Sequence, residues 1–469
     1  MISVMVSQNR SDVALLYRRA GFGLRSDELD RLSAGTYEAA VDGLIAGLGG
    51  AADPGSAHLP EPTLTLPARP KKGDLAALKA FNKAITADTQ SLQAWWMEKM
   101  ITTSTPLRER LTLFWHGHFA TAVSKVRYPK LMYLQNQLFR TAGAGSFETL
   151  MQAVAKDGAM MIWLDTITDK KAHPNENFGR EMMELFTLGL GNYTQDDVVA
   201  GAEGFTGWTY NTTADRYVFQ RAQHDYATKT YLGQTGDWNG NDIVSIAVTR
   251  PASPRFVLSK LWSHFAYPVS PAEQVVSDLV DAYGSGMSVS SALRAIFLHP
   301  DFRSDTTRTG LVKQPVEYLV GAARTLGLDS TLRPLSTSGS ANGTAGGRAA
   351  KLGTAGASTK LKPIGLAALA TTLGQTLFDP PNVGGWGQNT YWLDTVTALK
   401  RFEIALILAE RGDITPVSSV PASERVDAAA SFLGVDGWGP TTASALAQVA
   451  DRPSELVALA LSSPEYVIA

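Results

Sequence analysis

Apolar residues recur every three or four positions along most of the chain, which is the period of one face of an α-helix. Segments with this spacing, bounded by capping or stop residues, cover residues 12–20, 26–48, 75–96, 106–117, 253–265, 271–283, 288–298, 313–326, 364–377 and 391–411. Strict alternation of aromatic and polar residues is clear only in residues 207–211 and 216–220. The pattern therefore predicts a mainly α protein, a multi-helix globular fold with one or two small β-hairpins.

Two stretches lack the helical spacing. Residues 49–72 are rich in Gly, Pro and Ala, which is typical of a long surface loop. Residues 329–362 consist mostly of Ser, Gly, Thr and Ala, with almost no large apolar side chains. This composition indicates a flexible loop within one fold, and a linker between domains is the alternative. We expect residues 1–469 to form a single helical region that contains both loops.

Polar side chains with functional chemistry are most concentrated between residues 173 and 189. If this segment is helical, six of them project within an arc of roughly 140°, and apolar residues fill the opposite side. The six are Asn175, Glu176, Asn177, Arg180, Glu181 and Glu184. Asn175 is placed as an N-cap, and Gly189 as a C-terminal stop. Glu176, Arg180 and Glu184 stand four residues apart, so we expect the arginine to pair with carboxylates along one stripe.

This helix face has two interpretations. Charged residues on an amphipathic helix normally face water, and pairs four residues apart stabilise a helix by only ~0.2–0.5 kcal/mol. The face contains no Lys, however, and it begins with two Asn, which disfavour a helix unless they cap it or bind something. The segment is therefore a candidate for binding or catalysis, with a solvated or structural face as the alternative.

Two histidines with one residue between them follow Trp115. On a continuous helix His116 and His118 would point roughly 200° apart, so they could bind one metal only if Gly117 breaks the helix. A structural role is the alternative for each histidine, because buried imidazole nitrogens normally have hydrogen-bond partners.

Further candidate residues are scattered along the chain. His224 precedes Asp225, and a carboxylate that orients an imidazole can tune it as a base, although such pairs also occur by chance. Lys229 follows four residues later. Asp165 comes after an apolar run and is either a cap residue or an inward-pointing carboxylate. Trp208, at the start of the expected hairpin, is a candidate for binding.

The segment from Asp379 to Trp386 reads Asp-Pro-Pro-Asn-Val-Gly-Gly-Trp. Its prolines fix the backbone of one half, and its glycines permit a close approach of backbone or ligand in the other half. Asn382 and Trp386 are therefore candidates for ligand contact, and a purely architectural loop is the alternative.

Composition excludes several kinds of site and partner. The chain has no cysteine, so disulfides, thiolate metal ligands and cysteine nucleophiles are excluded. Any metal would need His, carboxylate or carbonyl ligands, which leaves a divalent cation open as a cofactor. The net charge is −2 and no Lys/Arg run is present, so nucleic acid is not an expected partner.

The expected location follows from two features of the sequence. No apolar run is long enough to span a membrane, so no transmembrane segment is expected. The first nine residues lack the basic and apolar regions of a signal peptide, which favours the cytoplasm.

The chain resembles a bacterial family known as domain of unknown function 1800. The resembling segments follow in order along nearly the whole chain: residues 16–23, 114–121, 175–189, 204–208, 224–225 and 373–386. The most specific is Asn-Glu-Asn-Phe-Gly-Arg-Glu-Met-Met-Glu-Leu-Phe-Thr-Leu-Gly at 175–189, in which Gly179 stands where the family usually has Ala. The resemblance implies a mainly helical protein without an assigned reaction. It also implies a sulfatase-like partner protein, and export, because many relatives carry export signals.

Two functions remain open at this point. The first is a helical binding or assembly module associated with the sulfatase-like partner, in which the polar residues form a buried network. The alternative is a hydrolase, metal-dependent or acid/base, with a carboxylate/His/Arg pocket. Its candidate residues are Asp165, Glu176, Arg180, Glu181, Glu184, His116, His118, His224 and Asp225. We expect His116 or His118 to lie near Glu181 or Glu184, and Arg180→Ala to destabilise the fold.

Overall fold

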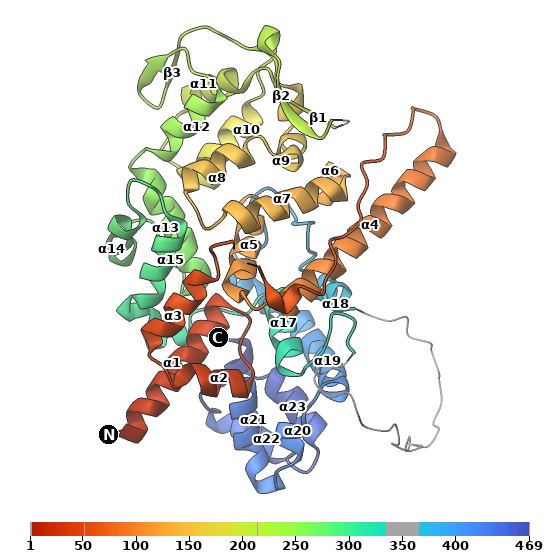
Figure 1. Cartoon of the computed structure of the whole chain (residues 1–469), viewed down its shortest axis with the longest axis vertical. Coiled ribbons are helices and arrows are strands. Elements are labelled where there is room, and N and C mark those ends of the chain that lie inside the picture. The colour runs from red at the N-terminus through yellow and green to blue at the C-terminus, as the bar shows by residue number, and fades with distance from the viewer. Residues whose placement is uncertain (1, 51, 213, 334–364, 469) are drawn as a thin grey trace.

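The computed structural model describes residues 2–50, 52–212, 214–333 and 365–468. Helices make up most of these residues, and the strands among them form two small antiparallel hairpins (Figure 1). The prediction of a mainly α fold is therefore confirmed. No helix in the described part of the chain is long and apolar enough to cross a membrane.

The N-terminal helices lie at the left and centre of Figure 1, and α4 extends away from the body toward the upper right. They are α1 (Ile2–Ala20), α2 (Ser26–Ser33), α3 (Tyr37–Ala46), α4 (Leu75–Thr102) and α5 (Pro106–His118). The connection before α4 contains one short 3-10 helix, η1 (Pro54–Ser56). Asp74 caps α4 by accepting a hydrogen bond from the amide N–H of Ala77 (2.9 Å). Helix α5 starts with Pro106, and a proline is tolerated there because the first N–H groups of a helix have no partner within the helix.

The elements that follow fill the upper part of the molecule (Figure 1). The helices there are α6 (Val123–Val126), α7 (Pro129–Ala142), α8 (Phe147–Val154), α9 (Gly158–Trp163), η2 (Thr166–Thr168), α10 (Glu176–Glu181), η3 (Met182–Thr187), α11 (Gln195–Phe205), η4 (Arg221–Gln223) and α12 (Gly240–Val248). The strands are β1 (Trp208–Asn211), β2 (Arg216–Phe219), β3 (Lys229–Tyr231) and β4 (Gln234–Gly236). β1 pairs with β2 so that Trp208 lies opposite Phe219, as the alternation predicts. The strands of the second hairpin are too short to show alternation in the sequence.

The remaining helices complete the left side, the centre and the base of the molecule (Figure 1). The first group is α13 (Ala252–Phe265), α14 (Gln274–Tyr283), α15 (Val289–Leu298), η5 (Pro300–Arg303), α16 (Asp305–Thr309), α17 (Pro315–Thr325) and α18 (Leu366–Thr372). The second group is η6 (Asn389–Trp392), α19 (Thr395–Arg411), α20 (Thr415–Ser418), η7 (Ala422–Glu424), α21 (Arg425–Leu433), α22 (Pro440–Ala447), α23 (Pro453–Leu461) and α24 (Pro464–Val467).

The buried apolar side chains form two clusters. One joins residues of α1, α3, α8, α13 and α15, and the other joins residues of α4, α17, α18, α19, α21 and α23. Helix α5 belongs to both, because Phe114 and Trp115 lie in the first cluster and Leu113 lies in the second. A polar group on α5 is therefore held between two packed bodies of side chains, which fixes its position.

Several predicted boundaries are wrong: α1 begins at Ile2 rather than at residue 12, α4 continues to Thr102 rather than ending at 96, and α14 begins at Gln274 rather than at 271. The helix expected at 26–48 is two helices, because Thr36 caps α3 by accepting the amide N–H of Ala39 (3.1 Å). The helix expected at 364–377 ends at Thr372, before Gly374, whose φ of +93° does not continue a helix. The helix expected at 391–411 starts only at Thr395. Of the loop expected at 329–362, all but residues 329–333 lie outside the described residues.

Candidate functional site

The polar segment at 175–189 begins as predicted, but it changes its helix type halfway. Asn175 accepts the amide N–H of Asn177 (3.0 Å) and caps α10. The next segment, η3, is a π-helix, in which Leu188 donates its amide N–H to the carbonyl of Met183 (2.8 Å), five residues earlier. Gly189 ends it with φ +79°, at a point where a Cβ would stand 2.9 Å from the ring of Phe256. π-helices are rare and occur frequently at functional sites.

The predicted polar stripe on this segment is formed only in part. Arg180 Nη2 donates to Glu176 Oε2 (2.9 Å) and to Gln195 Oε1 (3.0 Å). Glu184 instead accepts the hydroxyl of Tyr193, because spacing by four residues does not keep side chains in line through a π-helix. The side chains of Arg180 and Glu176 are 37% and 44% exposed, so their pair is of the kind worth ~0–1 kcal/mol. The polar face is therefore half-buried and partly solvated.

Each candidate histidine on α5 has its own partner. His116 is buried and accepts the amide N–H of Phe378 at Nε2 (3.1 Å), so its proton is on Nδ1. His118 donates its Nε2 proton to the carbonyl of Phe186 (3.0 Å). Burial lowers the pKa of both imidazoles to about 3, which keeps them neutral. Gly117 does not break the helix, so the two rings do not converge on one metal.

We expected His116 or His118 to lie near Glu181 or Glu184, but the contact between the histidines and this segment is made by the backbone. His118 contacts the polar segment at Phe186, two residues after Glu184. Among the described residues neither His116 nor His118 forms a hydrogen bond or ion pair with a carboxylate. Partial burial and the neighbouring Glu184 raise the pKa of Glu181. No group of three or more His, Asp or Glu side chains in the described ranges could hold a metal ion. The geometry therefore does not assemble the predicted carboxylate/His/Arg pocket.

The glycines at 384–385 act as the sequence suggests. Gly385 has φ +83°, and a Cβ on it would lie 2.3 Å from the carbonyl oxygen of Gly117, so the loop backbone touches α5 between the two histidines. Trp386 is buried with its ring edge-on to His116 (centroids 5.2 Å apart). Asn382 is exposed and accepts the amide N–H of Gly384 (2.8 Å), which is a turn contact. The loop locks α5 in place.

The His224–Asp225 pair does not form a dyad. His224 Nδ1 donates to the carbonyl of Thr206 (2.8 Å), so a backbone group orients the imidazole. Asp225 accepts the amide N–H of Ala227 (2.7 Å). Buried Lys229 directs its ammonium to the carbonyls of Asp225 and Ala227 (2.7 Å each). Asp225 therefore does not hydrogen-bond to His224 among the described contacts; its carboxylate lies 3.9 Å from Lys229 Nζ instead.

Two further candidates have surface or packing positions. Asp165 is exposed with φ +61° and pairs with Lys125 Nζ (2.8 Å), so it neither caps a helix through its side chain nor points inward. Trp208 is buried against Phe205 (centroids 5.2 Å apart) and Tyr217 (5.1 Å) at the base of the hairpin. Asn177 lies beside the cap of α10 and is half-buried.

A small polar cavity is lined by residues of three of the resembling segments, 114–121, 175–189 and 373–386, and we call it the junction cavity. It is bounded by α5, η3, α13, the residue before α17 and the 384–388 loop, and its volume is about 70 Å³. The lining residues are Leu113, Phe114, Gly117, His118, Leu185, Lys260, His264, Gln314, Gly384, Trp386 and Gln388. None of them is acidic, which sets the cavity apart from the polar face of α10.

The polar groups of the junction cavity are incompletely paired. His264 is buried, and its Nε2 has no hydrogen-bond partner among the described residues. Burial, with Arg110 and Arg19 nearby, lowers its pKa well below 6.5, so the ring is neutral. Lys260 is exposed and forms no hydrogen bond or ion pair with described side chains; its ammonium lies 5.4 Å from the centroid of the Phe256 ring. A buried polar group without a partner is uncommon enough to need an explanation.

Three residues of interest carry no clear mark in the sequence: two on the wall of the junction cavity, and one beside the start of α10. His264 and Lys260 lie on α13, and the only signal was that Leu-Trp-Ser-His-Phe at 261–265 echoes Phe-Trp-His-Gly-His-Phe at 114–119. Asp169 is buried, accepts the amide N–H of Asn175 (2.9 Å) and leaves Oδ2 without a partner. Burial raises its pKa to about 7. No pattern marks Asp169, because its burial depends on distant segments.

The structure thus defines a mainly helical protein in which three of the motifs line a small, acid-free polar cavity. The family described as "Protein of unknown function (DUF1800)" matches residues 15–468, nearly the whole chain, and the chain belongs to this family. The resemblance given by the sequence segments is confirmed. Comparison with curated proteins and with solved structures gave no match.

Proposed function

We propose that the protein is a binding protein that takes a small ligand with a carboxylate group and an apolar body in the junction cavity. The observation that carries this proposal is the buried Nε2 of His264, which has no partner and lies on a residue of the cavity wall. A ligand that supplies this partner would remove the cost of an unsatisfied buried group, about 1–3 kcal/mol.

The lining favours this class of ligand. Among the described residues Lys260 has no counter-charge, and the amide oxygen of Gln314 accepts from Gln375 Nε2 (2.8 Å), which orients the amide nitrogen of Gln314 as the donor left for a ligand. Both are donors, and a carboxylate accepts from ammonium and amide groups. Phe114 and Leu185 supply apolar surface on the same cavity. Together these groups match a small molecule with an acidic end and an apolar remainder.

The test is calorimetric titration with acetate and with acetamide, which has nearly the same shape but no charge; both are small enough for a cavity of about 70 Å³. We expect acetate to bind at least tenfold more tightly than acetamide. Lys260→Met should remove this preference, because it keeps the length of the side chain and loses its charge. Lys125→Met is the control, since Lys125 pairs with Asp165 outside the cavity. Equal binding of both compounds, or an unchanged preference in Lys260→Met, would overturn the proposal.

Docking of a partner protein is a second candidate function, and a separate observation favours it. A run of large apolar side chains is exposed over η6 and α19, and we call it the 391–402 surface. Its members are Tyr391, Leu393, Val396, Leu399 and Phe402. Val396 and Leu399 are 68% and 59% exposed and stand one helical turn apart. Exposed apolar side chains that cluster in this way are typical of protein interfaces.

The family resemblance makes a sulfatase-like protein the partner to test. Leu399→Glu should abolish co-purification of the two proteins without loss of folding, because the side chain is exposed. Leu190→Glu is the matched control, since Leu190 is 76% exposed in another part of the chain. Co-purification unchanged by Leu399→Glu would contradict this function. Cell fractionation of the complex shows which location is right: the cytoplasm, which the sequence favours, or the exported location that the family resemblance implies.

The hydrolase alternative lacks support from the geometry. Its candidate side chains contact different partners: Arg180 pairs with Glu176, Glu184 with Tyr193, and His118 with a backbone carbonyl. General acid/base chemistry needs the acid and the base within hydrogen-bond reach of one reacting group.

A further inference from the structure

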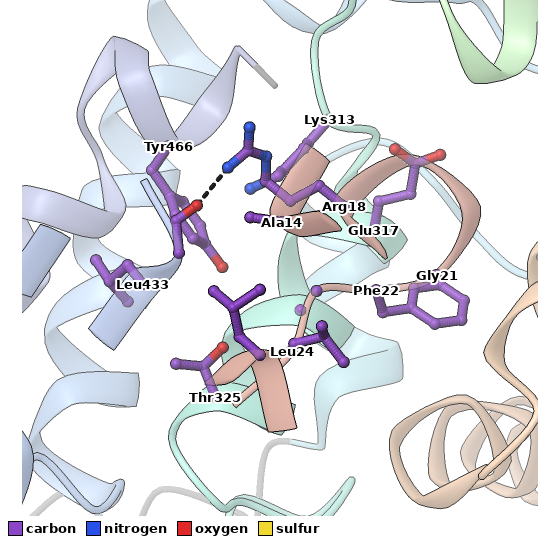
Figure 2. A pocket seen from close by; sticks show the side chains of 14 residues that line it. Ala14, Arg18, Gly21, Phe22, Leu24, Lys313, Glu317, Thr325, Leu433 and Tyr466 are labelled. Atoms are coloured by element: carbon purple, nitrogen blue, oxygen red, sulfur yellow. Dashed lines mark hydrogen bonds between the residues drawn. The ribbon is translucent and has the colours of Figure 1, made fainter. Parts of the chain in front are cut away.

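A second cavity brings together side chains from both ends of the chain, and we call it the Arg18 cavity. It lies between α1, the turn after it, α17, the end of α21 and Tyr466 of α24 (Figure 2). Its volume is about 20 Å³, which is room for a single water-sized particle. Arg18 and Lys313 bring positive charge to its wall, and Glu317 brings the negative charge.

The acidic side chain on the wall of the Arg18 cavity already has a cationic partner outside the cavity. The Glu317 carboxylate forms an ion pair with Arg110. Figure 2 shows that this carboxylate points away from the end of the cavity where Arg18 and Lys313 come together. The groups around Lys313 are therefore three arginines, Arg18, Arg19 and Arg110, and a single acid that is paired elsewhere.

The two cations on the wall have donors to spare. Arg18 directs one terminal nitrogen to the carbonyl of Gly434 and lies 3.7 Å from Asp436, but its Nε is buried without a partner. The ammonium of Lys313 lies 3.6 Å from the centroid of the Tyr466 ring and forms no hydrogen bond or ion pair with a described residue. An ammonium carries three donors, so Lys313 is the least satisfied cation of the cluster.

Electrostatics makes this arrangement costly unless something else is bound. Burial and the charge of Arg18 lower the pKa of Lys313 well below 10.5. Burial and Arg18 also lower the pKa of Arg19 to about 9. Buried charges are normally paired, because an isolated ion pays a large desolvation penalty. A cavity with several positive charges on its wall has the electrostatics of an anion-binding site.

We propose that the Arg18 cavity binds one small monatomic anion, chloride under ordinary conditions, between Arg18 Nε and Lys313 Nζ. The volume suits a halide and is too small for a tetrahedral oxyanion such as phosphate or sulfate. The bound anion links Arg18 of α1 to Lys313, which lies just before α17. The ring of Tyr466, near the C-terminus, covers the other side of Lys313. The role of the anion is structural, because it supplies Lys313 with a counter-charge that none of the described residues provides.

The first test is a thermal melt at constant ionic strength, in which sodium gluconate is replaced stepwise by sodium chloride. A ligand that binds only the folded state raises the Tm with its concentration, and we expect a rise of about 1–2 °C or more. Bromide should act like chloride, and sulfate should not. An unchanged Tm across the series would mean that only water occupies the cavity, which overturns the proposal.

The second test uses substitution at the site. Lys313→Met keeps the length of the side chain and removes its charge, so the variant should fold and lose the chloride dependence of its Tm. In gluconate it should be at least as stable as the parent, because the repulsion between half-buried Lys313 and the neighbouring arginines is gone. Lys125→Met, an exposed lysine elsewhere, should keep the dependence. A Lys313→Met protein that still responds to chloride would contradict the assignment.

The third test locates the ion directly. Crystals of the whole chain grown in gluconate and soaked in sodium bromide should give an anomalous peak between Arg18 Nε and Lys313 Nζ. A peak elsewhere, with none in the Arg18 cavity, would overturn the proposal even if chloride raises the Tm.

Discussion

The polar face of α10 and the junction cavity differ in how their polar groups are satisfied. On α10 the charges are close together in the sequence, and Arg180 and Glu184 have partners at a partly exposed surface. In the junction cavity the groups come from distant segments; among the described residues buried His264 Nε2 lacks a hydrogen-bond partner and exposed Lys260 lacks a counter-charge. A dense run of charges in the sequence therefore marks the family, whereas the proposed ligand site rests on an unsatisfied group that lies on a cavity wall.

The largest expected effect comes from a buried ion pair that supports α5. Glu109 binds Arg140 through two contacts (2.7 and 2.8 Å) and accepts the indole N–H of Trp96 (2.9 Å). Burial alone would raise the pKa of Glu109, but Arg140 and Trp96 bring it below its usual value. Arg140→Ala leaves a buried carboxylate unpaired and should lower the free energy of unfolding by ~3–5 kcal/mol. Chemical denaturation measures it, and a loss below 1 kcal/mol would show that water reaches Glu109.

The next effect concerns the contact that holds the 384–388 loop on α5. Gly385→Ala combines a positive φ with a Cβ only 2.3 Å from the carbonyl oxygen of Gly117, so we expect a loss of ~2–4 kcal/mol. Gly73→Ala is the matched control, because Gly73 has φ +95° and open space around its Cβ position. Gly73→Ala should lower the free energy of unfolding only by the backbone strain, ~1–2 kcal/mol. Equal losses in the two variants would mean that the loop does not press on α5.

A smaller effect tests the buried acid beside α10. The folded-state pKa of Asp169 is about 7, above its ordinary 3.8, so wild-type protein loses stability as the pH rises from 3.8 to 7. Asn resembles the protonated acid. Asp169→Asn should therefore be more stable than wild type by ~1–3 kcal/mol at pH 8 and nearly equal at pH 4. Melts at the two pH values measure the difference, and a variant that is less stable at pH 8 would show that the carboxylate itself is needed.

The smallest effect is expected on the polar face of α10. Because Arg180 is partly exposed, Arg180→Ala should cost ~0–1 kcal/mol, so our expectation from the sequence that it destabilises the fold is withdrawn. Thermal melts of Arg180→Ala and Arg140→Ala, side by side, measure the contrast. A loss from Arg180→Ala that matches the loss from Arg140→Ala would remove the distinction between the two regions.

Much of the fold follows from local signals. Asn175 at the start of α10, the capping box of Thr194 and Asp197 at α11, and the β1–β2 hairpin were all predictable, because caps and alternation depend on neighbours in sequence. The π-helix η3 was not, since its five-residue bonding depends on how the segment packs against other helices.

The candidate site was predicted less well than the fold. His118, Trp386 and the glycines of the 384–385 pair were singled out and do lie around α5. His264 and Lys260 were not, because their position beside α5 results from packing between segments about 150 residues apart in the sequence. An unpaired nitrogen becomes visible only when all neighbours are in place, so sequence spacing could not have revealed it.

One calorimetric comparison decides between the two regions: acetate titrated into wild type, Arg180→Ala and Lys260→Met. We expect Arg180→Ala to bind acetate like wild type, and Lys260→Met to bind it at least tenfold more weakly. Loss of binding in Arg180→Ala, with Lys260→Met unchanged, would contradict this expectation and return the functional site to the polar face of α10.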